Sequence, residues 1–473
     1  MILTLFFLYL IPHVIPKPIT KQNITIGFVS NYCIFPTAKQ NSSLLLHYDD
    51  TIDWDLLQKS QIYGSVYFND VAMTVAVNTI NEDPNVLPGI HVNIKRFSDC
   101  GDWYPKAYMY NGQSAGYASA ITAGAVESNT DVIGVIGNQF STAAVGVAAS
   151  LSFNQIPYCS GNSLSPQLSD KNKFPYFWRT IPSIGLGKHI HQVLKSFNVS
   201  RVALIYQQDD TMGYQFYLDI QQTLLRNNMV LTAKIALPTQ WNNETMSYAA
   251  MMLENADARY IVVSGQGRFV TDVLWKMGNK GLVNDRNVWI SYKAPLDVRF
   301  TSYGPTYYQY VKGLIMLNPM APNQTNPLYT SVNKAINATA EYNYPDEPLM
   351  DFIYWMSLNP RYDCTKMMLT AFDHLLKTTN FTVGQLANRE LQSYLNYSAY
   401  RGLGYHGLTL DPMEITDNGD LASPYEAFYF TGSGTSKTLF GRTDIGGRPS
   451  QLFEDPFSSQ EKASHHLTAT MIQ

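Results

Sequence analysis

Several features that mark other classes of protein are scarce or missing in this sequence of 473 residues. Charged residues make up 15% of the chain, the net charge is −4, and lysine and arginine form no cluster, which argues against nucleic-acid binding. No apolar run beyond the N-terminus reaches the ~20 residues of a membrane-spanning helix. Four cysteines are too few for a disulfide scaffold, and no Cys/His spacing suggests a metal site.

Motifs of known enzyme classes are also missing. The chain contains no His-Glu-x-x-His and no Walker loop, and its Gly-x-Ser-x-Gly string, Gly112–Gly116, lies inside an expected helix and not at the strand-to-helix turn of a nucleophile elbow. Gly265-Gln266-Gly267 follows an expected strand but lacks the third glycine of a dinucleotide fingerprint, so it is interpreted as a strand-to-helix turn. We therefore expect no catalytic residues and no cofactor, and a hydrolase or transferase on an α/β sheet is only a remote alternative.

The N-terminus predicts entry into a secretory pathway. Met1–Leu10 is almost wholly apolar and is followed by prolines, so residues 1–20 are interpreted as a signal peptide. The alternative is a first β-strand, but residues 24–29 already supply one. Eight Asn-x-Ser/Thr sequons agree with glycosylation in such a pathway. They lie at Asn23, Asn41, Asn198, Asn243, Asn323, Asn337, Asn380 and Asn396.

The stretch from Asp131 to Ser183 is the most informative part of the chain. An apolar run at residues 132–137 ends in a polar loop, a helical run of small residues follows at 142–153, and a second apolar run at 156–159 ends in Ser160-Gly161-Asn162-Ser163. This order is typical of a βαβ unit, whose parallel strands deliver both loops to one sheet edge. Ligands of open α/β sheets bind at that edge.

Strand and helix patterns alternate along most of the sequence, which predicts parallel sheets covered on both faces. Residues 317–349 are rich in Asn, Pro and Thr and are interpreted as loop or irregular helix. The expected strands are 24–29, 90–97, 132–137, 156–159, 201–206, 230–237, 260–264 and 288–292. The expected helices are 62–81, 108–128, 142–153, 187–197, 213–227, 244–255, 269–278 and 363–377.

Three motifs stand out along the chain. They are Leu168-Ser169-Asp170 leading to Phe177–Ser183, the helix end and Leu-Pro-Gly turn of residues 76–90, and Gly407–Leu410 leading to Asp417–Asp420. Together they resemble the extracellular ligand-binding region of class C G-protein-coupled receptors and natriuretic peptide receptors. The resemblance runs from about residue 24 to 430. It implies the type I periplasmic-binding fold, or Venus flytrap, in which two Rossmann-like lobes are joined by a hinge of three crossings.

The resemblance also implies the domain limits. Lobe 1 is expected to contain residues 24–182 plus about 345–400, and lobe 2 residues 183–318 plus about 402–440. Residues 441–473 would form a polar tail.

The cysteines divide into two pairs. Cys33 and Cys100 follow neighbouring parallel strands, so we expect them to form a disulfide, which the family often has there. Cys159 and Cys364 are interpreted as buried free thiols, although their pairing is left open.

Ser141 stands where a strand gives way to a helix, and it is expected to be the helix N-cap. By the resemblance it corresponds to a serine that grips the ligand carboxylate in glutamate-type receptors. Other family contacts are replaced here. Asn162 and Leu164 stand for Ser and Thr, Met212 stands for a Tyr, and Ile184 and Tyr292 stand at the two positions of the amine-binding acid.

The ammonium group of a buried amino acid requires a carboxylate beside it, and neither aligned position holds one. Asp209 and Asp210 would have to shift from their aligned positions to supply this carboxylate. Amino-acid binding is therefore in doubt, and a neutral metabolite is as good a candidate as an amino-acid-like ligand. Further candidates follow from position alone. They are Gln139, Ser160, Ser163, Gln208, Gln266 and Trp103.

The sequence thus predicts an extracellular small-ligand-binding protein that closes a cleft on its ligand and is coupled to membrane signalling if a transmembrane part exists. We expect it to be secreted or to stand on the outer face of the plasma membrane, and a homodimer through lobe 1 is plausible by the resemblance. The alternative is a secreted scavenger or decoy that binds a ligand without signalling.

Overall fold

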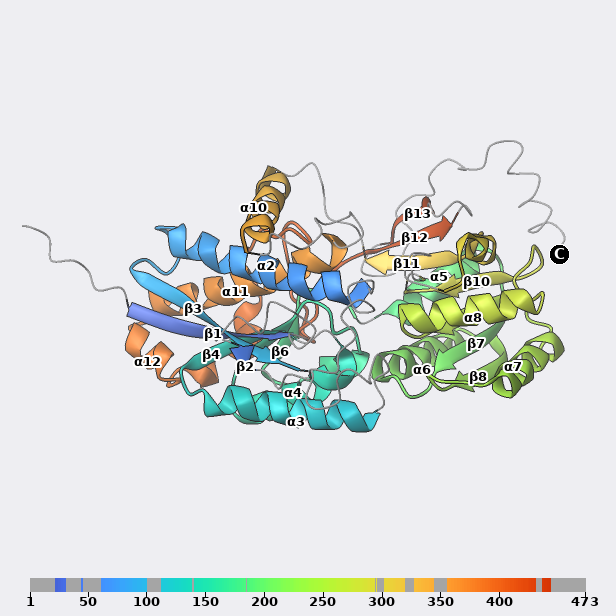
Figure 1. Ribbon diagram of the computed structural model, residues 1–473, viewed down its shortest axis with the longest axis horizontal. Helices are drawn as coiled ribbons and strands as arrows, with labels where there is room; N and C mark the ends of the chain where they lie inside the picture. The colour runs from blue at the N-terminus through green and yellow to red at the C-terminus, as the bar shows by residue number, and fades with distance from the viewer. Residues whose placement is uncertain are drawn as a thin grey trace, which may run out of the picture.

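Two α/β lobes lie side by side in the computed structural model (Figure 1). The structure describes residues 22–30, 44–45, 61–99, 112–137, 140–183, 185–293, 295, 302–319, 327–343, 355–430 and 436–443. Each lobe is built on one sheet with helices on both faces, which is the α/β class that the sequence predicts.

The sheet of lobe 1 has six strands in the order β2-β3-β1-β4-β5-β6, and all neighbours pair in parallel. The strands are β1 (Gln22–Ser30), β2 (Leu44–Leu45), β3 (Ile90–Ser98), β4 (Val132–Gly137), β5 (Tyr158–Ser160) and β6 (Phe177–Arg179).

The sheet of lobe 2 has seven strands in the order β13-β12-β11-β10-β9-β7-β8. The five strands from β11 to the β8 edge pair in parallel with one another. β12 pairs antiparallel with β11 on one side and with β13 on the other. The strands are β7 (Arg201–Gln207), β8 (Val230–Leu237), β9 (Tyr260–Ser264), β10 (Val288–Ser291), β11 (Ile315–Pro319), β12 (Tyr425–Phe430) and β13 (Ser436–Thr443).

Helices cover both faces of each sheet (Figure 1). Lobe 1 carries α2 (Gln61–Glu82), α3 (Gly112–Ser128), α4 (Ser141–Phe153), η3 (Pro166–Ser169), α10 (Pro327–Asn343), α11 (Trp355–Thr378), α12 (Val383–Ala387), η7 (Gln392–Tyr394) and η8 (Tyr397–Tyr400). Lobe 2 carries α5 (Leu186–Ser196), α6 (Thr211–Arg226), α7 (Asn243–Asn255), α8 (Gly267–Asn279), η5 (Pro305–Tyr307) and α9 (Tyr308–Val311).

Four apolar clusters form the core, one for each face of each sheet. In β7, Ala203 and Ile205 face one cluster, whereas Val202 and Leu204 face the other. Alternate side chains of a strand point to opposite faces, so a strand that is buried on both faces is an unbroken apolar run. This explains why the central strands could be recognised from the sequence.

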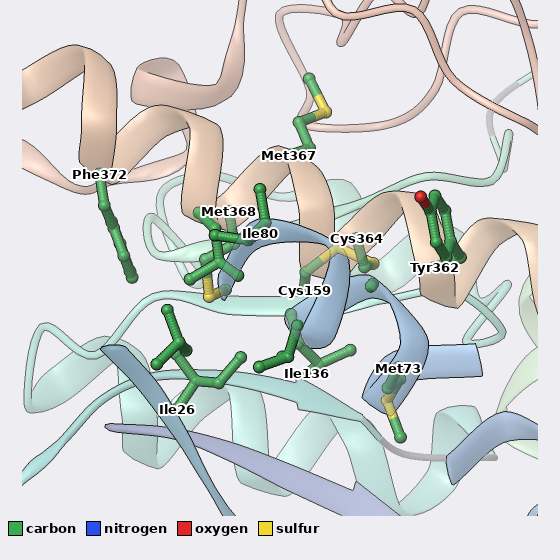
Figure 2. Close-up of a cluster of buried hydrophobic side chains, with 14 of the residues drawn as sticks. Ile26, Met73, Ile80, Ile136, Cys159, Tyr362, Cys364, Met367, Met368 and Phe372 are labelled. Carbon is green, nitrogen blue, oxygen red and sulfur yellow. A yellow bond between two sulfur atoms is a disulfide. The ribbon is translucent and has the colours of Figure 1, made fainter. Parts of the chain in front are cut away.

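The largest cluster of lobe 1 lies between its sheet and the helices α2, α10 and α11. Figure 2 shows part of it, including the Cys159–Cys364 disulfide that joins β5 to α11. The interpretation of these two residues as free thiols is therefore wrong. Both sulfur atoms are fully buried where β5 crosses α11, and the sequence carries no signal of that contact. Cys33 and Cys100 lie outside the described residues, and their bridge stays a prediction.

The segment interpreted as loop or irregular helix also differs from the expectation. It contains the short strand β11 and the regular helix α10. Tyr329, Val332 and Ile336 lie on one side of α10 and are buried against the core of lobe 1. Tertiary packing of this apolar stripe outweighs the weak helix propensity of the many Asn and Thr residues around it.

The chain passes between the two sheets three times, as expected for the hinge of this fold: after β6, between β11 and α11, and before β12. The first and third passages are bonded to each other, because Arg179 N–H donates to Gly419 O (2.9 Å) and Leu421 N–H donates to Ile181 O (3.2 Å). The first is also bonded to α11, since the Thr180 hydroxyl donates to Pro360 O at 2.5 Å.

Candidate functional site

The carboxyl edge of the lobe 1 sheet gathers four of the residues selected from the sequence. Ser141 is 3% exposed and is the first residue of α4, so the N-cap residue is Phe140 and the N-cap prediction is wrong by one position. The reason is tertiary: the Ser141 hydroxyl accepts a hydrogen bond from Ser165 N–H (3.0 Å) instead of from its own helix. Ser141 thereby holds the loop after β5 against α4.

Within that loop, the Ser160 hydroxyl accepts hydrogen bonds from the backbone N–H groups of Asn162 (3.3 Å) and Ser163 (3.0 Å). Ser160 and Ser163 are fully buried, whereas Asn162 is half-buried. The two serines therefore shape the loop, and Asn162 is the member of the set that a ligand could reach.

The carboxyl edge of the lobe 2 sheet is organised around Gln207, the last residue of β7, which is 4% exposed. Its amide nitrogen donates to the Thr239 hydroxyl (2.7 Å), and its amide oxygen accepts from Gln266 N–H (2.9 Å). The sequence-based candidate was the next residue, Gln208, which is exposed. Alternate residues of a strand face the same side, so Gln207 shares a face with the buried Ala203 and Ile205. This pattern in the sequence could have selected Gln207 instead of Gln208.

Asp209 and Asp210, which an amine ligand would need, already have other donors. The Asp209 carboxylate accepts from Thr239 N–H (2.8 Å) and from the Thr239 hydroxyl (2.8 Å). Asp210 is the N-cap of α6: one oxygen accepts from Gly213 N–H (2.7 Å), and the other accepts from the Gln266 side chain (3.1 Å). Both carboxylates thus already accept hydrogen bonds from groups of lobe 2.

Tyr292 and Lys293 follow β10 at the same edge. Tyr292 is 6% exposed and packs on Phe216 with ring centroids 4.5 Å apart, so it belongs to the core of lobe 2 and its ring does not line an open surface. Burial raises the pKa of Tyr292 well above its ordinary value, and Asp210 adds to this effect, so the hydroxyl stays protonated.

Lys293 was not selected from the sequence. Burial lowers the pKa of its ammonium group to about 8, although the Asp210 carboxylate acts in the opposite direction. Its Nζ atom has no hydrogen bond or ion pair with any residue that the structure describes. An ammonium group at a strand end is thus available to an oxygen atom of a ligand.

The two edges meet through apolar contacts. Helix α6 of lobe 2 contacts α4 and η3 of lobe 1. Leu164, in the loop after β5, packs against the lobe 2 cluster that contains Met212 and Phe216. Leu164 and Met212, two positions where the resemblance implies polar ligand contacts, thus both contribute to apolar packing in this structure.

A buried ion pair fixes the hinge beside this site. Arg179 Nε donates to Asp420 Oδ1 at 2.6 Å, and both side chains are almost fully buried. The other nitrogens of Arg179 donate to Ser163 O (2.6 Å), Ser165 O (3.0 Å) and the Ser169 hydroxyl (2.6 Å). The Ser169 hydroxyl in turn donates to Asp420 Oδ2 at 2.7 Å. Two motifs 241 residues apart therefore join at the end of β6 and hold the loop after β5.

Gln139 and Trp103, the remaining candidates, lie outside the described residues. Across the described ranges, no group of three or more His, Cys, Asp or Glu residues is arranged to hold a metal ion. The helices in those ranges are also too short or too polar to cross a bilayer.

Comparisons with known proteins agree with this architecture. Residues 69–433 match the model of the receptor family ligand binding region, and the chain therefore belongs to that family. It is 33% identical over 181 residues to a metabotropic glutamate receptor of Drosophila melanogaster, covering 34% of this chain and 18% of the receptor. It is 27% identical over 147 residues to taste receptor type 1 member 3 of Rattus norvegicus, covering 30% of this chain and 17% of the receptor. The chain thus spans less than a fifth of the length of these relatives.

Proposed function

We propose that this protein is the extracellular ligand-binding part of a receptor and that it closes on a small organic ligand between the carboxyl edges of its two sheets. The observation that carries the proposal is the packing of Leu164 of lobe 1 against the apolar cluster of lobe 2, beside a hinge fixed by Arg179 and Asp420. Contacts that form only when two lobes approach supply the free energy of closure.

The chemistry of the edges favours a ligand with oxygen atoms and without a cationic amine. Asp209 and Asp210 have their hydrogen-bond donors within the protein, so a buried ammonium would find no free carboxylate near them. Lys293 offers a donor to a carbonyl, hydroxyl or carboxylate oxygen. A neutral metabolite fits this set better than an α-amino acid.

Secretion, glycosylation and dimerisation belong to the same proposal. The Cys159–Cys364 disulfide suits an oxidising compartment. Among the sequons in the described ranges, those at Asn23, Asn198, Asn243 and Asn380 are exposed. The homodimer through lobe 1 is proposed on the family resemblance alone.

A thermal-shift screen tests the binding role, because a ligand that binds only the folded state raises the melting temperature by mass action. The panel contains neutral metabolites, organic acids and amino acids. We expect a hit among the first two classes, and Lys293→Met should reduce its shift. Lys276→Met, on α8 of lobe 2, is the matched control for a half-buried lysine.

Closure is tested by small-angle scattering with and without the hit. Leu164→Ser should enlarge the radius of gyration of the free protein, whereas Met251→Ser, at a 45% exposed position on α7, should leave it unchanged. An unchanged radius with ligand and in Leu164→Ser would argue against closure. Turnover of the ligand would argue for the enzyme alternative.

The second candidate, a secreted scavenger or decoy, shares the same site. The transcript beyond Gln473 separates the two roles, since an apolar segment of about twenty residues there would place the domain on a receptor.

A further inference from the structure

Lobe 1 contains a cavity away from the edge described above. It lies among α2, α10, α11 and the loop at residues 405–406, on the face of the sheet opposite to α3 and α4 (Figure 1). Its volume is about 320 Å³. This is at the lower end of the range for small-molecule sites, which is roughly 300–1,000 Å³. At about 30 Å³ for each water-sized group, it has room for roughly ten non-hydrogen atoms.

The walls of this cavity are mostly apolar. Val75 of α2 and Val332 and Ala335 of α10 contribute aliphatic surface. The hydroxyl groups at the walls are already used as donors. Thr79 donates to Val75 O (2.7 Å), and Tyr405 donates to Asp363 (3.0 Å). The apolar surface therefore favours a ligand body made of hydrocarbon.

Lys366 of α11 is the exception in this wall. It is half-buried, and its ammonium group has no hydrogen bond or ion pair with any residue within the described ranges. Burial lowers the pKa of Lys366, and the carboxylates of Asp83 and Asp363 offset part of this effect from a distance. Both acids have other donors: Asp83 accepts from Asn85 N–H, and Asp363 accepts from the N–H groups of Leu408 and Thr409.

The other basic side chain of the cavity stands at the rim. His406 Nδ1 lies 2.5 Å from Asp411 Oδ1, and the histidine side chain is 72% exposed. His406 thus already has an acidic partner, whereas Lys366 has none among the described residues. An apolar cavity whose wall holds a lysine without a partner among the described residues is complementary to an apolar molecule that carries one anionic group.

We propose that this cavity is a second ligand site, which binds a monocarboxylic acid with an apolar body and places the carboxylate on Lys366. The ligand would be an aliphatic or aromatic acid of roughly ten non-hydrogen atoms, given the volume for each atom used above. The site is separate from the edge that carries Lys293, so the two can be tested independently.

Isothermal titration of the full chain with octanoate, and with octan-1-ol as the uncharged match, tests this assignment. We expect octanoate to bind, octan-1-ol to bind at least about tenfold more weakly, and Lys366→Met to weaken octanoate at least about tenfold. Lys366→Arg, which keeps the charge, should retain most of the binding. Ala335→Phe should abolish it by filling the cavity.

One matched variant locates the effect. Lys276→Met in α8, at a half-buried lysine outside both sites, should leave octanoate binding unchanged. Loss of binding in Lys293→Met alone would place the acid between the lobes and overturn the assignment. Equal binding of octanoate and octan-1-ol, or no octanoate binding up to about 10 mM, would overturn it as well. The wild-type comparison of the two ligands decides the matter even if a variant does not fold.

Discussion

The Arg179–Asp420 pair is a buried ion pair at the hinge. The carboxylate of Asp420 receives Arg179 Nε and the Ser169 hydroxyl, and Arg179 makes three further hydrogen bonds to Ser163, Ser165 and Ser169. The exposed fractions of the two side chains are 0% and 3%. Water therefore cannot replace a lost partner at this position.

Asp420→Asn keeps the shape of the side chain and removes its charge. The guanidinium group then stays buried without a counter-charge, which typically costs about 3–5 kcal/mol in the free energy of unfolding. Arg179→Met should cost a similar amount, because it leaves the carboxylate with only the Ser169 donor. In the double variant neither charge remains, so its cost should fall below the sum of the two by more than about 2 kcal/mol.

Urea unfolding followed by tryptophan fluorescence measures these costs, since Trp178 is fully buried next to Arg179. The control is Asp131→Asn. Asp131 pairs with Lys95 at 2.7 Å, but the two side chains are 51% and 39% exposed. A surface pair of this kind is worth about 0–1 kcal/mol and weakens with salt.

The reasoning would be refuted if Asp420→Asn cost no more than Asp131→Asn, or if the two hinge substitutions were additive. A cost that disappears in high salt would also contradict it, because a pair excluded from water is screened far less than an exposed one.

Three further predictions concern other parts of the chain. Replacing Cys159 and Cys364 together by Ala should lower the free energy of unfolding by roughly 5 kcal/mol in the chain-entropy model for their 205-residue separation, and an unchanged urea midpoint would contradict this. Burial holds the pKa of Lys293 at about 8 in the folded protein, below its ordinary value of 10.5, so the stability it contributes is complete above pH 10.5 and is lost as the pH falls through 8. Lys293→Met should thus be more stable than wild type at pH 7, and this advantage should fade towards pH 10.5; a constant advantage across the titration would be inconsistent with it. Expression in a secretory host should add glycans that a glycosidase removes, and single Asn→Gln variants should each lower the mass by one glycan. The positions to test are Asn23, Asn198, Asn243 and Asn380.

Much of the fold follows from local patterns. The central strands are unbroken apolar runs because both sheet faces are covered, and the helices between them carry apolar stripes at helical spacing. The acidic cap of α6 is also a local signal, since Asp210 precedes the helix and bonds to Gly213 three residues on. Local patterns do not predict α10, because its apolar stripe is short and many of its other residues favour turns.

The candidate site could be predicted only in part. Position at strand ends correctly placed Ser141, Ser160, Asn162 and Ser163 on one edge, since the carboxyl ends of parallel strands share an edge. Which of these side chains remain accessible depends on hydrogen bonds between segments, such as Ser165 N–H to the Ser141 hydroxyl. No spacing in the sequence encodes that bond.

The sequence by itself determined the α/β class and the family resemblance, because both are properties of residue type and order. The tertiary structure decided that Cys159 bonds to Cys364, that Arg179 meets Asp420, and that Lys293 and Lys366 have no partner among the described residues. Those facts depend on which distant segments come within a few ångströms of one another, and the free energy that selects these contacts is spread over the whole packed core.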